Sequence, residues 1–206
     1  MPLVEDAKKV LESVTGYRRP SSEEISVQKM RPESHSFEDD GETPNNSRFP
    51  LLLYRSVVTL SPDYDPAATF EELFKANGWA GSWRDSIYPY NHFHTGTHEV
   101  LGIARGTARV QFGGAAADAI ELAAEDVIVI PAGTGHCALE KSDDLLVVGA
   151  YPRECEGAYD EPRPCEADPT DARASIAAVE APPRDPVYGA GGPLREIWWR
   201  RHNGHR

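Results

Sequence analysis

Seven short runs that fit the period of two of a β-strand follow one another between residues 86 and 151, and they constrain the fold of this chain more than any other feature. Alternation with a period of two places successive side chains on opposite faces of a β-strand. Glycine turns separate the runs, and short strands at such regular spacing are typical of an all-β sandwich or barrel. The predicted strands are 86–94, 99–104, 107–112, 119–122, 126–130, 136–141 and 145–151. A further apolar and β-branched strand is predicted at 49–59.

One helix is predicted to pack on the outside of the sheet, before the first of these seven runs. Phe70, Leu73 and Phe74 recur at helical spacing. Asp65-Pro66 or a capping box four residues later provides a start, and Asn77-Gly78 provides an end.

The flanking segments divide the chain into three parts. Residues 1–33 are predicted to be an extension with at most one short amphipathic helix, residues 34–200 a single domain, and residues 201–206 a basic tail. Within the domain, the acidic and proline-rich segment 152–169 is predicted to be a surface loop, and Trp198 and Trp199 are expected to cover apolar surface.

The charge of the chain excludes several classes of protein. With 33 acidic and 21 basic residues among 206, the formal net charge is −12, which repels nucleic acid and anionic lipid. No apolar run approaches the roughly 18 residues of a membrane-spanning helix, and the first residues are too charged for a secretory signal. The three cysteines show no close pairing motif. We therefore expect a cytoplasmic protein with no nucleic-acid or membrane partner.

Histidines gather at one point of the predicted sheet and indicate a metal site. His92 and His94 are two residues apart, so a strand places both imidazoles on one face. A turn at 95–97 would bring the Glu99 carboxylate across from them, and His136 follows a tight turn after the strand 126–130. Imidazole nitrogens with one carboxylate oxygen suit one divalent ion such as Fe(II), Mn(II), Ni(II) or Zn(II).

The same alternation of side chains along a strand suggests which residues line a pocket beside this site. Tyr88 and Tyr90 share the face of the two histidines if the strand is continuous, but Pro89 favours an edge or a bulge, and both tyrosines are equally consistent with core packing. Leu101 and Ile103 lie on the same face of their strand as Glu99, which suggests apolar walls for the pocket. These four residues are the pocket candidates for a small, partly apolar ligand.

The histidines belong to a pattern that resembles the two motifs of the cupin superfamily. The first motif, Gly-x5-His-x-His-x(3 or 4)-Glu-x6-Gly, matches at His92, His94, Glu99 and Gly106, and the second, Gly-x5-Pro-x-Gly-x2-His-x3-Asn, matches at Pro131, Gly133 and His136. The departures are Ser86 and Glu125 in place of glycine and Glu140 in place of asparagine. Further phrases, such as 77–79, 81–84 and 147–152, resemble a group of small single-domain cupins called YjlB-like.

This resemblance implies a double-stranded β-helix, or jelly-roll barrel, with one or two short helices outside and a metal at its centre, often in a homodimer. Its spacing selects Glu99 over His98 as the fourth ligand, which leaves His98 as an outward residue at a sheet or subunit contact. Cys137, next to His136, is predicted to pack rather than to bind metal. Asp85, Asp126, Asp143 and Asp144 have the pattern of ordinary surface acids.

Three functions are compatible with the resemblance. An Fe(II)-type dioxygenase acting on a small organic molecule is favoured, because nitrogen-rich ligation with vacant positions tolerates oxygen chemistry. The alternatives are a non-catalytic cupin that binds or senses a small molecule, and a metal-dependent isomerase.

Overall fold

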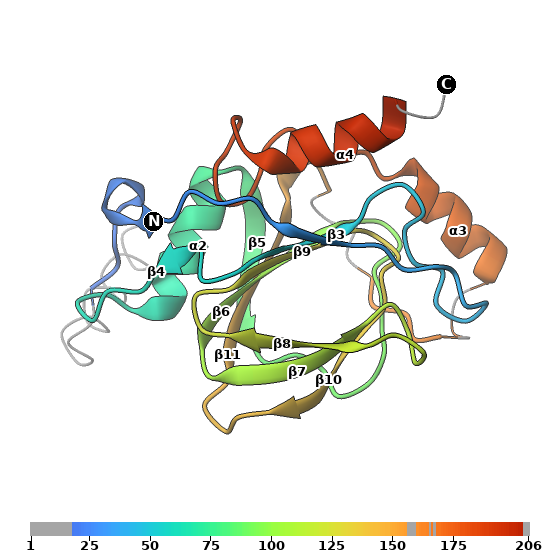
Figure 1. The fold of residues 1–206 in the computed structure, drawn as a ribbon, viewed down its shortest axis with the longest axis horizontal. Helices are drawn as coiled ribbons and strands as arrows, with labels where there is room; N and C mark the ends of the chain where they lie inside the picture. Colours follow the sequence, from blue (N-terminus) through green and yellow to red (C-terminus); the bar gives the residue numbers. More distant parts are fainter. Residues whose placement is uncertain (1–17, 156–159, 165, 167, 204–206) are drawn as a thin grey trace, which may run out of the picture.

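Two facing β-sheets form a barrel in this computed structural model, which describes residues 18–155, 160–164, 166 and 168–203 (Figure 1). The larger sheet has the strand order β2-β3-β9-β6-β11-β5 and the smaller has the order β10-β7-β8. The strands of the larger sheet are β2 (Glu33–His35), β3 (Leu51–Tyr54), β5 (Trp79–Asp85), β6 (Glu99–Arg105), β9 (Val127–Ile130) and β11 (Leu146–Pro152). The strands of the smaller sheet are β7 (Thr107–Phe112), β8 (Ala119–Ala123) and β10 (His136–Lys141). All neighbours in both sheets are antiparallel, and the non-sequential order confirms the predicted all-β jelly roll.

Alternation of side chains along the strands fills the space between the two sheets. Leu101 and Ile103 on β6, Val110 and Phe112 on β7 and Ile128 on β9 are all buried there. Burial of each such side chain stabilises the fold by roughly 1.5–3 kcal/mol. Six of the seven predicted runs coincide with strands to within two residues at each end.

The remaining run, residues 86–94, is not a strand, and that prediction was wrong. β5 ends at Asp85, and the chain continues as irregular backbone beside β10, where Ala138 N donates to Tyr88 O over 2.8 Å and His92 forms an isolated bridge with His136. Pro89 lies between these two contacts and has no N–H to donate, so it cannot take part in a continuous ladder.

The predicted helix is confirmed as α2 (Pro66–Ala76), which lies on the outer face of the larger sheet. The Asp65 side chain caps its first turn by accepting from Ala67 N over 3.1 Å. Phe70 and Phe74 are fully buried beneath it. Gly102 on β6 leaves room for the Phe70 ring, because a Cβ atom at that position would come within 2.3 Å of the ring.

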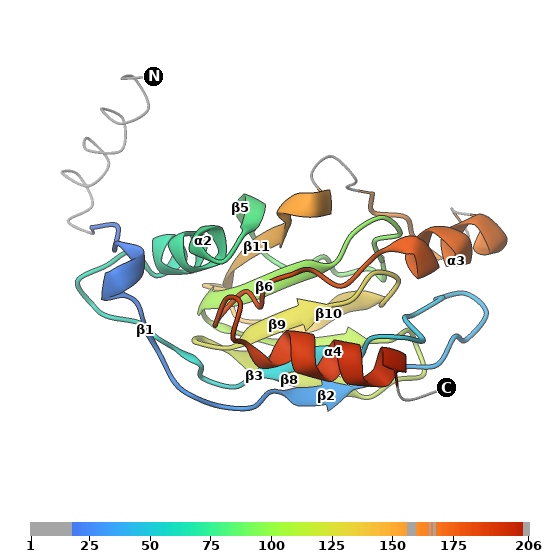
Figure 2. The same cartoon turned by 90° about the horizontal axis from the view of Figure 1, so that it is seen from above.

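Two more helices lie outside the barrel, so the described chain has three where one or two were predicted: α3 (Pro169–Ala178) and α4 (Pro193–Asn203). Figure 2 shows α4 running across the larger sheet. Trp198 is fully buried under it, stacks on Phe49 with ring centroids 4.6 Å apart and donates to Pro50 O. Trp199 is 54% exposed, so only one of the two tryptophans covers apolar surface in the predicted way. None of the described helices has the length and apolar character to cross a membrane.

The described residues before the barrel pack onto it. A turn of 3-10 helix (Ser22–Glu24) precedes β1 (Ser26–Val27), which pairs with β4 (Val58–Thr59). Tyr188 from the C-terminal part donates its hydroxyl to Gln28 O. The amphipathic helix predicted near the start of the chain lies outside the described residues, and the domain limits at 34 and 200 stay predictions.

Asp126 is buried, so the prediction that it is an ordinary surface acid was wrong. It accepts from Ser56 N and Ala123 N over 2.8 and 3.1 Å and pairs with Arg55 at 3.2 Å. Its neighbour Glu125, at the position of a motif glycine, has a φ of +80°, which is a conformation that glycine adopts freely.

Asp185 joins the segment before α4 to the barrel through hydrogen bonds. Its side chain is fully buried and accepts four hydrogen bonds, from the Tyr54 hydroxyl at 2.6 Å and from the backbone N–H groups of Val187, Tyr188 and Leu194 at 2.8, 3.0 and 3.1 Å.

Candidate metal centre

Three histidines meet inside one end of the barrel. His136 begins β10, and its backbone exchanges two hydrogen bonds with His92, so the two imidazole rings lie with centroids 4.1 Å apart. His94 lies two residues after His92, and its ring centroid is 5.9 Å from the ring centroids of both His92 and His136. One ring nitrogen from each of the three lies within 4.8 Å of the others, and all three residues are at most 4% exposed.

Backbone carbonyls fix which nitrogen of each ring faces inward. The Nδ1 atoms of His92 and His136 lie 3.3 and 3.2 Å from Tyr90 O and Thr134 O, and Nδ1 of His94 contacts Asp160 O. A carbonyl oxygen can only accept, so each Nδ1 carries a hydrogen and each Nε2 is the nitrogen that faces inward. Metal-binding histidines usually donate their other ring N–H to a carbonyl or carboxylate in this way, and the three residues fit a divalent ion.

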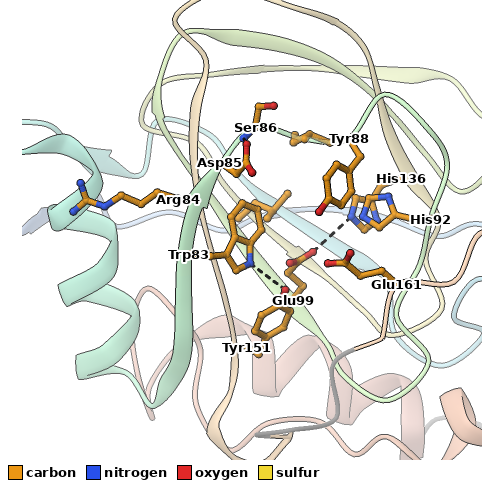
Figure 3. A pocket seen from close by; sticks show the side chains of 12 residues that line it. Trp83, Arg84, Asp85, Ser86, Tyr88, His92, Glu99, His136, Tyr151 and Glu161 are labelled. Atoms are coloured by element: carbon orange, nitrogen blue, oxygen red, sulfur yellow. Dashed lines mark hydrogen bonds and ion pairs between the residues drawn. The ribbon is translucent and has the colours of Figure 1, made fainter.

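The Glu99 carboxylate lies against the same group, at the first residue of β6. One of its oxygens is 3.2 Å from His94 Nε2 and 3.6 Å from His136 Nε2, and the residue is 2% exposed. The Tyr151 hydroxyl hydrogen-bonds this carboxylate and accepts a hydrogen bond from Trp83 Nε1 over 3.0 Å. Figure 3 shows these side chains converging from β5, β6 and β11.

The electrostatics of the centre favour a cation. Burial opposes the charge of Glu99, but the charge and hydrogen bond of His94 outweigh burial and lower the pKa of Glu99. Burial likewise opposes the charge of His94, and Glu99 outweighs it and raises the pKa of His94. Burial lowers the pKa of His92, and it lowers the pKa of His136 to about 3. Two neutral imidazoles therefore stand beside a buried ion pair, and a divalent cation can take the place of the His94 proton.

The turn before β10 sets the position of His136 and ties it to His94. Gly133 N donates to His94 O over 2.7 Å. Gly133 has a φ of +86°, and a Cβ atom there would come within 2.7 Å of Asn45 O. Only glycine fits this turn without displacing backbone. This explains why the second motif has a glycine at position 133.

A cavity of about 200 Å³ opens beside the histidines (Figure 3). Of the four predicted pocket residues, Tyr88 and Leu101 line it. Tyr90 is not among its lining residues but stacks on Tyr88 with centroids 4.9 Å apart, and Ile103 is buried deeper between the sheets. Asp85, predicted to be a surface acid, is exposed but lines the mouth of the cavity.

His98 points away from the metal centre, although it precedes Glu99 directly. It is fully buried beneath α4, where Nδ1 accepts from Ala132 N over 2.9 Å and Nε2 donates to Glu180 O over 3.2 Å. Burial lowers its pKa to about 3, so this imidazole is neutral. Cys137 is buried, as expected for a packing residue, and burial raises the pKa of its thiol.

Sequence reasoning missed the residues that reach the centre from distant segments. The loop predicted at 152–169 contributes Asp160, whose carboxylate accepts from Thr95 N at 2.8 Å and from the Thr95 hydroxyl at 2.6 Å, and Glu161, which lines the cavity. Trp83 lies on β5, which was not predicted. Tyr151 was within a predicted strand, and its alternation with the neighbouring residues was the one available signal.

A jelly-roll barrel that gathers three histidines and a glutamate of these two motifs defines a cupin. The chain belongs to the YjlB family of cupins, since it is 37% identical over 166 residues to the uncharacterised protein YjlB of Bacillus subtilis strain 168. The aligned region covers 81% of this chain and 96% of that protein. No family model matches the sequence.

Several solved structures are similar over part of the chain. Acireductone dioxygenase of Bacillus anthracis is 16% identical, with a TM-score of 0.34 over 49% of this chain and 76% of that one. A DUF861 family protein of Thermotoga maritima is 14% identical, with a TM-score of 0.29 over 48% and 96%. A mutant of Bacillus subtilis oxalate decarboxylase is 18% identical, with a TM-score of 0.34 over 64% and 33%. TM-scores this low carry no functional conclusion for this chain.

Proposed function

We propose that this cupin is a metal-dependent oxidoreductase of the dioxygenase type that acts on a small organic molecule. The observation that carries the proposal is the set of three buried imidazoles, each with Nε2 directed inward, beside the buried Glu99 carboxylate and an open cavity. Three nitrogens and one oxygen suit Fe(II), Mn(II), Ni(II) or Zn(II), and an octahedral ion would keep two positions for other ligands.

A bound ion supplies Lewis acidity or a redox centre, and the chain provides the surroundings. Tyr151 holds the Glu99 carboxylate, so the oxygen that faces His94 is fixed in direction. Leu101 and Ile87 line the cavity with buried apolar surface, which limits the access of water to the centre. Nitrogen-rich ligation with vacant positions tolerates oxygen chemistry, so a dioxygenase is proposed ahead of a metal-dependent isomerase.

Metal content tests the site first. We expect the purified wild-type protein to hold about one divalent ion per chain by elemental analysis, and the His94→Ala and His136→Ala variants to lose it. His35→Ala is the matched control, because His35 lies on β2 and does not line the cavity. Undiminished metal in both site variants with a native circular dichroism spectrum would refute the site.

Oxygen uptake tests the reaction. Wild-type protein loaded with Fe(II) is incubated with a panel of small acids, phenols and amines, and uptake that disappears in His94→Ala supports a dioxygenase. Turnover of a panel member without oxygen uptake supports the metal-dependent isomerase instead. Retained metal with no turnover at all supports the non-catalytic binding protein.

The proposal includes the environment and the assembly of the protein. A cytoplasmic location suits Cys137 and Cys155, which are free thiols in the described chain. A homodimer is proposed from the family resemblance, and light scattering would then give twice the 22.6 kDa mass of the chain. A mass of one chain at micromolar concentration would refute the dimer.

A further inference from the structure

The cavity beside the candidate metal centre is lined by three carboxylates. Glu99 lies at its base, Glu161 faces the histidines from the loop after β11, and Asp85 lies at the end of β5 (Figure 3). Together they outnumber the charge of a divalent ion by one. Any small molecule that enters the cavity therefore meets an excess of negative charge around the metal.

The one basic side chain among the described lining residues does not offset this charge. Arg84 directs its guanidinium away from the cavity toward α2, as Figure 3 shows. There it pairs with Glu71 at 2.6 and 3.0 Å and with Asp65 at 2.7 Å. Both acids hold the guanidinium outside, so Arg84 is not available to bind an anionic ligand.

Two further cations lie near the cavity and each contacts a neighbouring side chain. The Lys141 ammonium donates to the Ser86 hydroxyl over 2.8 Å, and Arg163 lies over the Tyr90 ring, 4.1 Å from its centroid. Neither lines the cavity. An incoming carboxylate or phosphate would find the metal ion, but among the described lining residues the one Arg or Lys side chain, Arg84, is already paired with Glu71 and Asp65.

Glu161 differs from these cations, because it lines the cavity and the backbone around it is attached to the histidine segment. The adjacent Asp160 is hydrogen-bonded to Thr95, and Phe93 N donates to Pro162 O over 3.2 Å, so backbone on both sides of Glu161 is attached to the histidine segment. Glu161 is exposed, and among the residues that the structure describes none donates a hydrogen bond to its carboxylate.

Aromatic side chains complete this part of the cavity. Tyr88 and Trp83 line the same cavity as Glu161, and Figure 3 places the Tyr88 hydroxyl on the cavity side. Aromatic faces and carboxylates both bind ammonium ions in proteins.

We propose that the ligand of this metal centre carries a positively charged amine, which lies against Glu161 between Tyr88 and Trp83 while the other end of the ligand faces the histidines. This inference rests on the proposed metal-dependent function and narrows its substrate class to small cationic amines. Small carboxylic acids are disfavoured, because a carboxylate there would face Glu161 and Asp85.

Three catechols that differ only in the charge of the side chain test the proposal. Dopamine carries an ammonium group, 4-ethylcatechol is neutral and 3-(3,4-dihydroxyphenyl)propionate carries a carboxylate, while all three present the same pair of metal-binding oxygens. Binding to the metal-loaded protein is measured by calorimetry. A favourable ion pair and an unfavourable like-charge contact at a partly exposed site each change affinity several-fold, so we expect dopamine to bind about tenfold more tightly than the propionate.

Glu161→Gln isolates the proposed contact, and Glu121→Gln is the matched control on β8, away from the cavity. We expect Glu161→Gln to bring the affinities for dopamine and the propionate to within about threefold of each other, and Glu121→Gln to leave the tenfold preference. Equal or tighter binding of the propionate to wild-type protein, an unchanged preference in Glu161→Gln, or no binding of dopamine to the metal-loaded protein would overturn the proposal.

Metal analysis of the same samples separates this proposal from the proposed function. Wild-type protein without metal contradicts the proposed function itself, whereas full metal content without a charge preference contradicts only the amine proposal. Loss of metal in Glu161→Gln would identify Glu161 as a metal ligand instead of an amine-binding residue, and would also overturn the proposal.

Discussion

Replacement of Asp185 by alanine removes the acceptor that joins the segment before α4 to the barrel. Four donors then lose their partner at a site with no solvent exposure: the Tyr54 hydroxyl and the N–H groups of Val187, Tyr188 and Leu194. A buried donor without a partner costs about 1–3 kcal/mol. Water that enters the vacated space can satisfy some of them, so we expect Asp185→Ala to lower the free energy of unfolding by about 4 kcal/mol.

A graded series shows whether the acceptor itself is responsible. Asp185→Asn keeps one acceptor, the amide oxygen, toward Val187 N and Tyr188 N, but it places an NH₂ group opposite Leu194 N. We therefore expect it to lower the free energy of unfolding by about 2 kcal/mol. Tyr54→Phe removes one of the four donors and leaves the other three paired, and should cost about 1 kcal/mol.

Urea unfolding followed by circular dichroism gives these free energies, with the slope against urea concentration as a check on two-state behaviour. Asp143→Ala is the control, because Asp143 is exposed and should change stability by less than about 0.5 kcal/mol. If Asp185→Ala unfolds within about 1 kcal/mol of the wild type at an unchanged slope, the buried acceptor does not stabilise the C-terminal segment and the reasoning fails.

Three further predictions concern acid stability, metal affinity and packing. His98 has a folded pKa of about 3 against about 6.5 when unfolded, so only the unfolded chain gains a proton as the pH falls from 6.5 toward 3, and stability is lost across that window. His98→Gln should therefore remove about 2 kcal/mol of the stability that metal-free protein loses between pH 7 and pH 5 in urea unfolding, and an unchanged loss would contradict the assigned burial. Asp160→Ala should weaken metal affinity about 10- to 100-fold in a chelator competition, because its carboxylate holds the turn after His94; unchanged affinity would deny it a positioning role. Trp198→Ala should cost about 3–5 kcal/mol and Trp199→Ala less than about 0.5 kcal/mol in the same unfolding assay, and similar losses for both would contradict their different exposure.

The fold was predictable where local pattern and tertiary burial agree. β7 alternates cleanly because only one of its faces is buried, whereas β6, β9 and β11 are short apolar runs because both of their faces are buried. β5 was missed, because Gly81 interrupts the apolar pattern and most of that strand is exposed at the sheet edge. α3 was missed for a similar reason: it buries only Ala172 and Ile176, which is too few apolar positions for a helical period to appear.

The candidate site was predictable only as far as its residues are close in sequence or share a motif. His92, His94 and Glu99 lie within eight positions of one another, and His136 follows a turn that glycine marks. Asp160 reaches the same centre across a sequence separation of 66 from His94. No periodicity encodes such a contact, because it depends on where the barrel places the loop.

The indole of Trp83 gives this protein an optical reporter of its own centre. Its N–H is bonded to the Tyr151 hydroxyl, and that hydroxyl is bonded to Glu99, so occupancy of the centre should alter the emission of this one tryptophan. Trp79 and Trp198 are buried outside the cavity, with their indoles bonded to backbone carbonyls, and should respond only when the barrel opens. In a titration with metal ion, a change in the emission of Trp83 would report binding at the centre, whereas a change in the emission of Trp79 and Trp198 would report unfolding.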